Sequence, residues 1–68
     1  MKIQVKTLPE NTIKEYNIHD SVTVEKLFKQ MNLKPDAVIA LRNNKPIPLT
    51  TVLQENDEIT IIKIASGG

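Results

Sequence analysis

The sequence predicts an α+β fold in which one helix packs across a mixed sheet of four to five strands. Three observations predict it: a length of 68 residues allows one domain, one segment has helical apolar spacing, and several short segments have strand-like patterns. A two-layer arrangement buries one helix stripe against one sheet face. Because the chain has no cysteine, disulfides cannot stabilise it, and the core must come from Ile, Leu and Val side chains.

The N-terminal segment predicts a β-hairpin. Residues 2–7 alternate in side-chain character, as in a half-buried strand. Pro9 favours a turn, and residues 12–18 return as a second strand. Ile13 has the opposite parity to the other apolar residues of this second strand. Either a bulge near Lys14 inserts one residue, or Ile13 points outward.

The next segment predicts a short helix. Thr23 is the expected N-cap, with Glu25 near the positive helix end. Four apolar residues then follow the i, i+3, i+4, i+7 spacing of one helix stripe: Val24, Leu27, Phe28 and Met31. Asn32 suits a left-handed C-terminal position, and Pro35 prevents continuation. So short a helix must depend on the sheet for stability.

The following residues predict a second, shorter hairpin. Residues 37–41 form an apolar run, interpreted as a buried strand. Residues 42–45 contain two asparagines and predict a turn, because Asn tolerates positive φ. Pro46 and Pro48 allow only a short or edge strand around Ile47.

The last part of the domain predicts a loop and a final strand. Residues 50–56 are expected to form a helical turn and loop that buries Val52 and Leu53. Residues 58–64 have a strand-like apolar pattern. The chain therefore divides into a domain over residues 1–64 and a tail over residues 65–68.

Charge and composition exclude several function classes. The net charge is +1 with the two signs interspersed, and Tyr16 and Phe28 are the only aromatic residues. Neither a basic stripe nor a stacking platform for nucleic acid is present. No apolar run approaches a membrane span, and the N-terminus has a strand pattern rather than a signal-peptide pattern. We therefore expect a cytoplasmic protein with no direct contact to nucleic acid or membrane.

The polar residues give no enzyme signature. The sequence has no nucleophile paired with a base, no metal-ligand set and no phosphate loop. His19 is expected to be a solvated turn residue, and the acids of residues 55–58 a solvated turn. Two interpretations remain for Arg42, Lys45 and Lys63: they steer acidic partners, or they guard a sheet edge against pairing.

The order of these segments resembles a known family. Three segments resemble the N-terminal half of ubiquitin: residues 1–8, 12–13 and 23–25. Five others resemble the prokaryotic sulfur carriers ThiS and MoaD and the archaeal small ubiquitin-like modifiers: Leu33-Lys34-Pro35, the apolar strand of residues 37–41, Asn44-Lys45-Pro46-Ile47-Pro48, Asn56-Asp57-Glu58-Ile59 and Ser66-Gly67-Gly68. The resemblance covers essentially the whole chain and implies a β-grasp, ubiquitin-like fold. Asn56 departs from it, because these carriers usually have glycine there.

The C-terminal residues are the candidate functional group. Gly67 and Gly68 are the only glycines in the chain, and a terminal pair has a chance frequency of roughly 0.5% at average glycine usage. Because glycine has no Cβ, a glycine backbone can enter the narrow nucleotide site of a partner enzyme. Its carbonyl carbon also stays accessible to attack by sulfur or an amine. Ala65 and Ser66 are also small, so residues 65–68 predict a flexible arm. The alternative is a frayed terminus that happens to contain two glycines.

The resemblance implies what this arm does. A partner adenylating enzyme uses ATP and magnesium to activate Gly68. Sulfur transfer then gives a thiocarboxylate for tRNA, thiamin or molybdopterin synthesis, or the activated glycine is conjugated to a lysine of another protein. The chain itself is then the substrate and not an enzyme, binds no cofactor of its own, and is a monomer when free.

The last strand also predicts a docking surface. If Ile59 and Ile61 face the helix, the residues between them face the other side of the sheet. The predicted partner-binding residues are Thr60, Ile62 and Ile64, extended by Leu8 or Leu41. Two alternatives stay open: the sheet twist buries part of this set, or scattered exposed apolar residues have no role. A second functional hypothesis follows from this surface, a β-grasp module that binds partners non-covalently.

Overall fold

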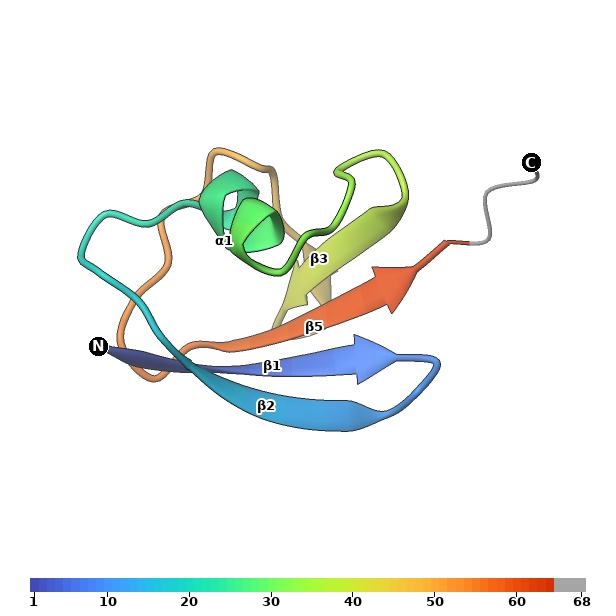
Figure 1. Cartoon of the computed structure of the whole chain (residues 1–68), viewed down its shortest axis with the longest axis horizontal. Coiled ribbons are helices and arrows are strands. Elements are labelled where there is room, and N and C mark those ends of the chain that lie inside the picture. The colour runs from blue at the N-terminus through green and yellow to red at the C-terminus, as the bar shows by residue number, and fades with distance from the viewer. Residues whose placement is uncertain (65–68) are drawn as a thin grey trace.

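The computed structural model describes residues 1–64, which form one five-stranded mixed sheet with a single helix on one face (Figure 1). The elements in chain order are β1 (Lys2–Leu8), β2 (Thr12–Asn17), α1 (Val24–Gln30), β3 (Val38–Arg42), β4 (Lys45–Pro46) and β5 (Glu58–Lys63). Their spatial order is β2-β1-β5-β3-β4. β1 and β5 pair in parallel, and all other neighbouring strands pair in antiparallel orientation. The predicted α+β fold with one helix on a mixed sheet is therefore confirmed.

The β1–β2 hairpin has a continuous register and no bulge. Pairing runs without interruption from Lys2 opposite Asn17 to Thr7 opposite Thr12. Ile13 lies opposite Lys6, on the side of the sheet away from α1, and its side chain is 64% exposed. Of the two alternatives for this strand, the outward orientation of Ile13 is therefore correct.

Helix α1 begins and ends where its capping residues predict. The Thr23 hydroxyl accepts a hydrogen bond from the Lys26 N–H at 3.3 Å. At the other end Asn32 has φ of 61°, and the N–H groups of Asn32 and Leu33 donate to the carbonyls of Lys29 and Phe28. This pair of bonds is a Schellman motif, which satisfies carbonyls that the helix leaves free.

The core lies between α1 and the sheet. The buried residues come from every element except β2 and β4, with further contributions from the connecting segments: Ile3, Val5, Ile18, Val24, Leu27, Phe28, Val38, Ala40, Leu53, Ile59 and Ile61. None of the buried residues in the described part of the chain is polar or charged. The alternate residues of β5, Ile59 and Ile61, face α1 as predicted.

The segment before β5 is an extended loop with turns, so the predicted helical turn over residues 50–56 is wrong. The loop passes the N-terminal end of α1, where the Val24 N–H donates to the Thr51 carbonyl and the Leu53 N–H to the Val22 carbonyl. In extended backbone, successive side chains point in opposite directions. Leu53 is accordingly 1% exposed, as predicted, whereas Val52 is 48% exposed and its predicted burial is wrong.

The β3–β4 connection is a tight turn built from asparagines. Asn43 and Asn44 have φ of 54° and 65°, the left-handed conformation that two-residue hairpin turns require. The strand that follows covers Lys45–Pro46 rather than Ile47, although the Ile47 N–H still donates to the Ala40 carbonyl at 3.0 Å. The prediction of a short edge strand is confirmed with a small change in its bounds.

Candidate functional site

The sheet has one face that α1 does not cover, here called the open face. Strand alternation places the even-numbered residues of β1 and β5 and the odd-numbered residues of β3 on it. In the register, Ile62 of β5 lies between Leu8 of β1 and Ile39 of β3. In the adjacent row, Thr60 lies between Lys6 and Leu41. The open face is therefore apolar toward the C-terminal end of β5.

Four of the five predicted partner-binding residues meet in these two rows: Leu8, Leu41, Thr60 and Ile62. The fifth, Ile64, directly follows β5. Its N–H donates to the Ala37 carbonyl at 2.9 Å, which continues the ladder, and its side chain is 45% exposed. The structure thus brings the predicted residues together on the open face.

Sequence reasoning missed Ile39, which belongs to the same surface. Its side chain is 40% exposed and lies opposite Ile62. The apolar run of residues 37–41 predicts a buried strand, from which only Leu41 is assigned to the docking surface. The alternation of buried Val38 and Ala40 around Ile39 shows that only one face is covered. We define the apolar patch as Leu8, Ile39, Leu41, Ile62 and Ile64.

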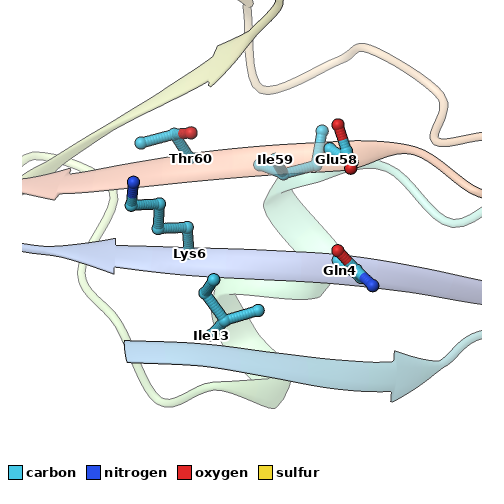
Figure 2. A pocket seen from close by; sticks show the side chains of 6 residues that line it. All are labelled: Gln4, Lys6, Ile13, Glu58, Ile59 and Thr60. Carbon is cyan, nitrogen blue, oxygen red and sulfur yellow. The ribbon is translucent and has the colours of Figure 1, made fainter. Parts of the chain in front are cut away.

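A shallow hollow of about 180 Å³ borders the apolar patch on the open face. Figure 2 shows Gln4 and Lys6 between Ile13 on one side and Glu58 and Thr60 on the other. The second residue that sequence reasoning did not assign to this surface is Ile13, since its orientation was left open. These side chains combine apolar, cationic, anionic and amide groups, which suits contact with a protein surface.

The four predicted tail residues, Ala65, Ser66, Gly67 and Gly68, lie outside the described residues. What the structure does define is the strand that leads to them. β5 is the central strand of the sheet and ends at the apolar patch, beside the turn that joins β1 to β2 (Figure 1). The candidate docking surface and the start of the tail are therefore adjacent.

An ion pair ties this end of β5 to the hairpin turn. The Lys63 ammonium lies 2.6 Å from Glu10 Oε2. This hydrogen bond, together with one from the Glu10 backbone and the positive charge of Lys63, lowers the pKa of the Glu10 carboxyl. Lys63 is thus engaged within the chain, and because β5 is the central strand, the interpretation that Lys63 guards a sheet edge is wrong.

Arg42 is also engaged internally. Its Nη2 donates to Asp57 Oδ2 at 2.7 Å and to the Val52 carbonyl at 3.2 Å. The same carboxylate oxygen accepts the Gln54 N–H at 2.8 Å. Asp57 is half-buried, so its expected place in a solvated turn is wrong: it fixes the loop before β5 to the end of β3.

Few other polar groups of residues 1–64 gather into a site. No group of three or more His, Asp or Glu side chains within this range could hold a metal ion. His19 is exposed, as expected. The described part of the chain contains no helix with the length and apolar character that a bilayer crossing requires.

The fold and the open face define a class of protein: a small ubiquitin-like β-grasp domain with an apolar patch next to its last strand. Solved structures with this fold include two archaeal proteins. A ubiquitin from Caldiarchaeum subterraneum superimposes with a TM-score of 0.75 at 19% identity, covering 100% of this chain and 98% of that one. SAMP1 from Haloferax volcanii superimposes with a TM-score of 0.72 at 15% identity, covering 100% of both chains.

The family itself follows from the sequence. The model of the ThiS family matches residues 4–68, so this chain belongs to the ThiS family. No curated protein matches the sequence significantly. Members of this family are non-catalytic carriers. The chain is therefore a sulfur carrier with a ubiquitin-like fold and not an enzyme, and it interacts with an activating enzyme and a sulfur-accepting partner.

Proposed function

We propose that Gly68 is the residue that a partner enzyme activates. In this reaction the Gly68 carboxylate attacks the α-phosphate of ATP, which is bound with magnesium by the partner, and pyrophosphate leaves. A sulfur nucleophile then displaces AMP from the acyl-adenylate and gives a thiocarboxylate, the sulfur donor for tRNA thiolation or cofactor synthesis. In conjugation, a lysine amine of a target protein attacks the activated carbonyl instead.

The observation that carries this proposal is the position of the only two glycines in the chain. Gly67 and Gly68 are the third and fourth residues after Ile64, which directly follows the central strand of the sheet, and the family match extends through them. Lacking side chains, they suit passage into a narrow nucleotide site. The apolar patch supports the same proposal, because it provides a docking surface beside the strand from which residues 65–68 continue.

The patch also favours a second candidate function, a module that binds its partners only non-covalently. The exposed side chains of Ile39 and Ile64, together with half-buried Ile62 between them, suffice for such binding without any chemistry at the glycines. The two functions differ in what happens to Gly68.

Removal of Gly68 separates the two functions. Three proteins are compared: the full chain, the chain without Gly68, and a Ser66→Ala control. Each is incubated with the adenylating enzyme of the same cells, ATP and magnesium, and the exchange of pyrophosphate into ATP is measured. We expect exchange with the chain and the control, and none above background without Gly68. Intact-mass analysis of the protein isolated from its own cells should also show that Gly68 is its last residue. The same analysis should show a mass increase that matches the replacement of one oxygen by sulfur.

Unchanged exchange after removal of Gly68 would refute the proposal. So would a protein that binds the adenylating enzyme but never acquires AMP or sulfur when all reactants are present. Those outcomes would favour the non-covalent module.

A further inference from the structure

The two edges of the sheet differ in how they are protected. At one edge, β4 has only two residues, Lys45–Pro46, and Pro48 follows shortly after it. Short strands and prolines prevent further pairing. At the other edge, β2 has six residues without proline, glycine or a bulge. A further strand can therefore add to β2 but not to β4.

The free backbone groups of β2 can be assigned from the hairpin register. Met1 and Ile18 exchange two hydrogen bonds, at 3.0 and 2.8 Å. Hydrogen-bonded pairs alternate along an antiparallel ladder. Ile13, Glu15 and Asn17 therefore direct their N–H and C=O groups away from β1, and no other hydrogen bond among residues 1–64 reaches these groups. They form a row of donors and acceptors along the outer edge of β2.

A groove of about 220 Å³ runs beside this edge on the side of the sheet that carries α1. Its residues come from β2, from the segment after α1 and from the ends of β1 and β5: Thr7, Glu10, Thr12, Lys14, Tyr16, Met31, Leu33 and Lys63. Tyr16, Met31 and Leu33 are half-buried and pack against the core, so they form an apolar wall. A strand added to β2 would direct every second side chain into this groove.

The charges around the groove select the kind of side chain that it accepts. Lys14 is exposed and lies on the groove side of β2. Glu10, the acid among the lining residues, is bonded to Lys63 and does not neutralise Lys14. Among the residues that line the groove, Lys14 is the basic residue that makes no ion pair within residues 1–64. The groove therefore complements an acidic side chain.

We propose that the edge of β2 and this groove bind an extended segment of another protein, which pairs with β2 as an added strand. Tyr16 and Lys14 are two residues apart on the same face. The bound segment therefore places an apolar side chain against the wall and an acidic side chain two residues away, beside Lys14. This surface is separate from the open face and from residues 65–68, and it goes beyond the proposed activation of Gly68.

The probe is a synthetic peptide of about eight residues, acetylated and amidated, in which β-branched residues and aspartates occupy alternate inward positions. It is titrated into the full isotope-labelled chain, and backbone amide shifts are followed by NMR. We expect shifts along β2 and over residues 31–33, and none centred on Ile39 and Ile62. A peptide with lysine in place of each aspartate should bind at least about tenfold more weakly.

Two variants with matched controls test the two parts of the site. Glu15→Pro removes one outward N–H without touching the β1–β2 ladder, and Glu15→Ala controls for the lost 3.7 Å ion pair with Lys2. Lys14→Glu reverses the charge beside the groove, and Lys6→Glu makes the same change on the open face. We expect about tenfold weaker binding for Glu15→Pro and Lys14→Glu, with little change for the controls.

The proposal is overturned by any of four results: no binding at millimolar peptide, shifts on the open face, equal binding by the lysine peptide, or peptide-independent self-association through β2. If Glu15→Pro fails to fold, as judged by its own spectrum, the Lys14→Glu and Lys6→Glu pair decides. None of these measurements involves adenylation. A result that overturns peptide binding at β2 therefore leaves the proposed role of Gly68 unaffected.

Discussion

At the scale of single residues, Asn56 explains how this chain departs from its family without losing the fold. The resemblance to ThiS-like carriers implies glycine at this position. Asn56 has φ of 65°, and its N–H donates to the Lys2 carbonyl at 2.8 Å. Asparagine is the residue other than glycine that best tolerates this left-handed conformation. The substitution therefore keeps the turn that starts β5.

Replacement of Asn56 should reveal this backbone requirement. We expect Asn56→Val to lower the free energy of unfolding by about 1–2 kcal/mol, because a β-branched residue is strained at positive φ. Asn56→Gly should change it by less than about 0.5 kcal/mol, since glycine adopts this φ freely but is more flexible when unfolded. Urea unfolding followed by circular dichroism measures both. Equal destabilisation by the two variants would contradict the explanation.

A second residue-scale prediction concerns acid titration of Glu10. Its pKa is lowered mainly by the hydrogen bond from Lys63. A carboxyl with a lowered pKa in the folded state stabilises the fold above its unfolded-state pKa, and that contribution is lost as the pH falls through the folded-state pKa. The effect is small because the pair is exposed to solvent.

We expect NMR titration of the Glu10 carboxyl to give a midpoint below that of an exposed glutamate, and Lys63→Met to move it back up. Lys45→Met, which removes a lysine that makes no ion pair with Glu10, is the control. A midpoint that does not respond to Lys63→Met would exclude the ion pair as the cause.

At the scale of elements, the loop before β5 is held by contacts between distant segments. The Arg42–Asp57 pair joins it to β3, and backbone hydrogen bonds from Val24 and Leu53 join it to the start of α1. These contacts determine which of two adjacent apolar residues is buried. The local sequence has no periodic signal that distinguishes Val52 from Leu53.

The adjacent pair gives a matched stability test. We expect Leu53→Ala to lower the free energy of unfolding by about 2–5 kcal/mol, because it leaves a cavity in the core. Val52→Ala should cost less than about 1 kcal/mol, since that side chain is largely exposed. Thermal and urea unfolding measure both values. Similar losses for the two variants would mean that Val52 is packed as well.

The difference between local and long-range information explains which parts of the fold and site could be predicted from the sequence. Segments with a clear local signal were placed correctly: the period of residues 2–7, the capped helix stripe, and the asparagines of the β3–β4 turn. The orientations of Ile13 and Ile39 depend on which strand lies beside them and on where α1 stops covering the sheet. No pattern within a single short strand contains that information.

At the scale of the whole molecule, the open face and the strand that leads to residues 65–68 form one continuous surface. A partner that docks on the apolar patch is therefore placed next to the start of those residues. For the adenylating enzyme, docking there would supply affinity, while the glycines enter the reaction. Substitutions on the patch should then affect activation without affecting the chemistry of Gly68.

Ile62→Thr tests this role, because threonine keeps the β-branched shape that a strand favours. We expect the chain to remain folded and the KM for activation by the adenylating enzyme to rise about tenfold or more, with kcat less affected. Val52→Thr makes the same type of change, from a β-branched apolar residue to threonine, at an exposed position on the loop before β5, and is the control. Equal kinetics for the two variants would place the docking surface elsewhere.

The parallel pairing of β1 with β5 has a consequence for how the protein is made. β5 occupies the middle of the sheet, so a nascent chain that has not passed residue 63 leaves both β1 and β3 without their shared neighbour. Native pairing must then wait until the last strand has left the ribosome. An interrupted translation product lacks the centre of its sheet and is open to proteases. A natively folded molecule has therefore been synthesised at least as far as the strand that precedes the two glycines.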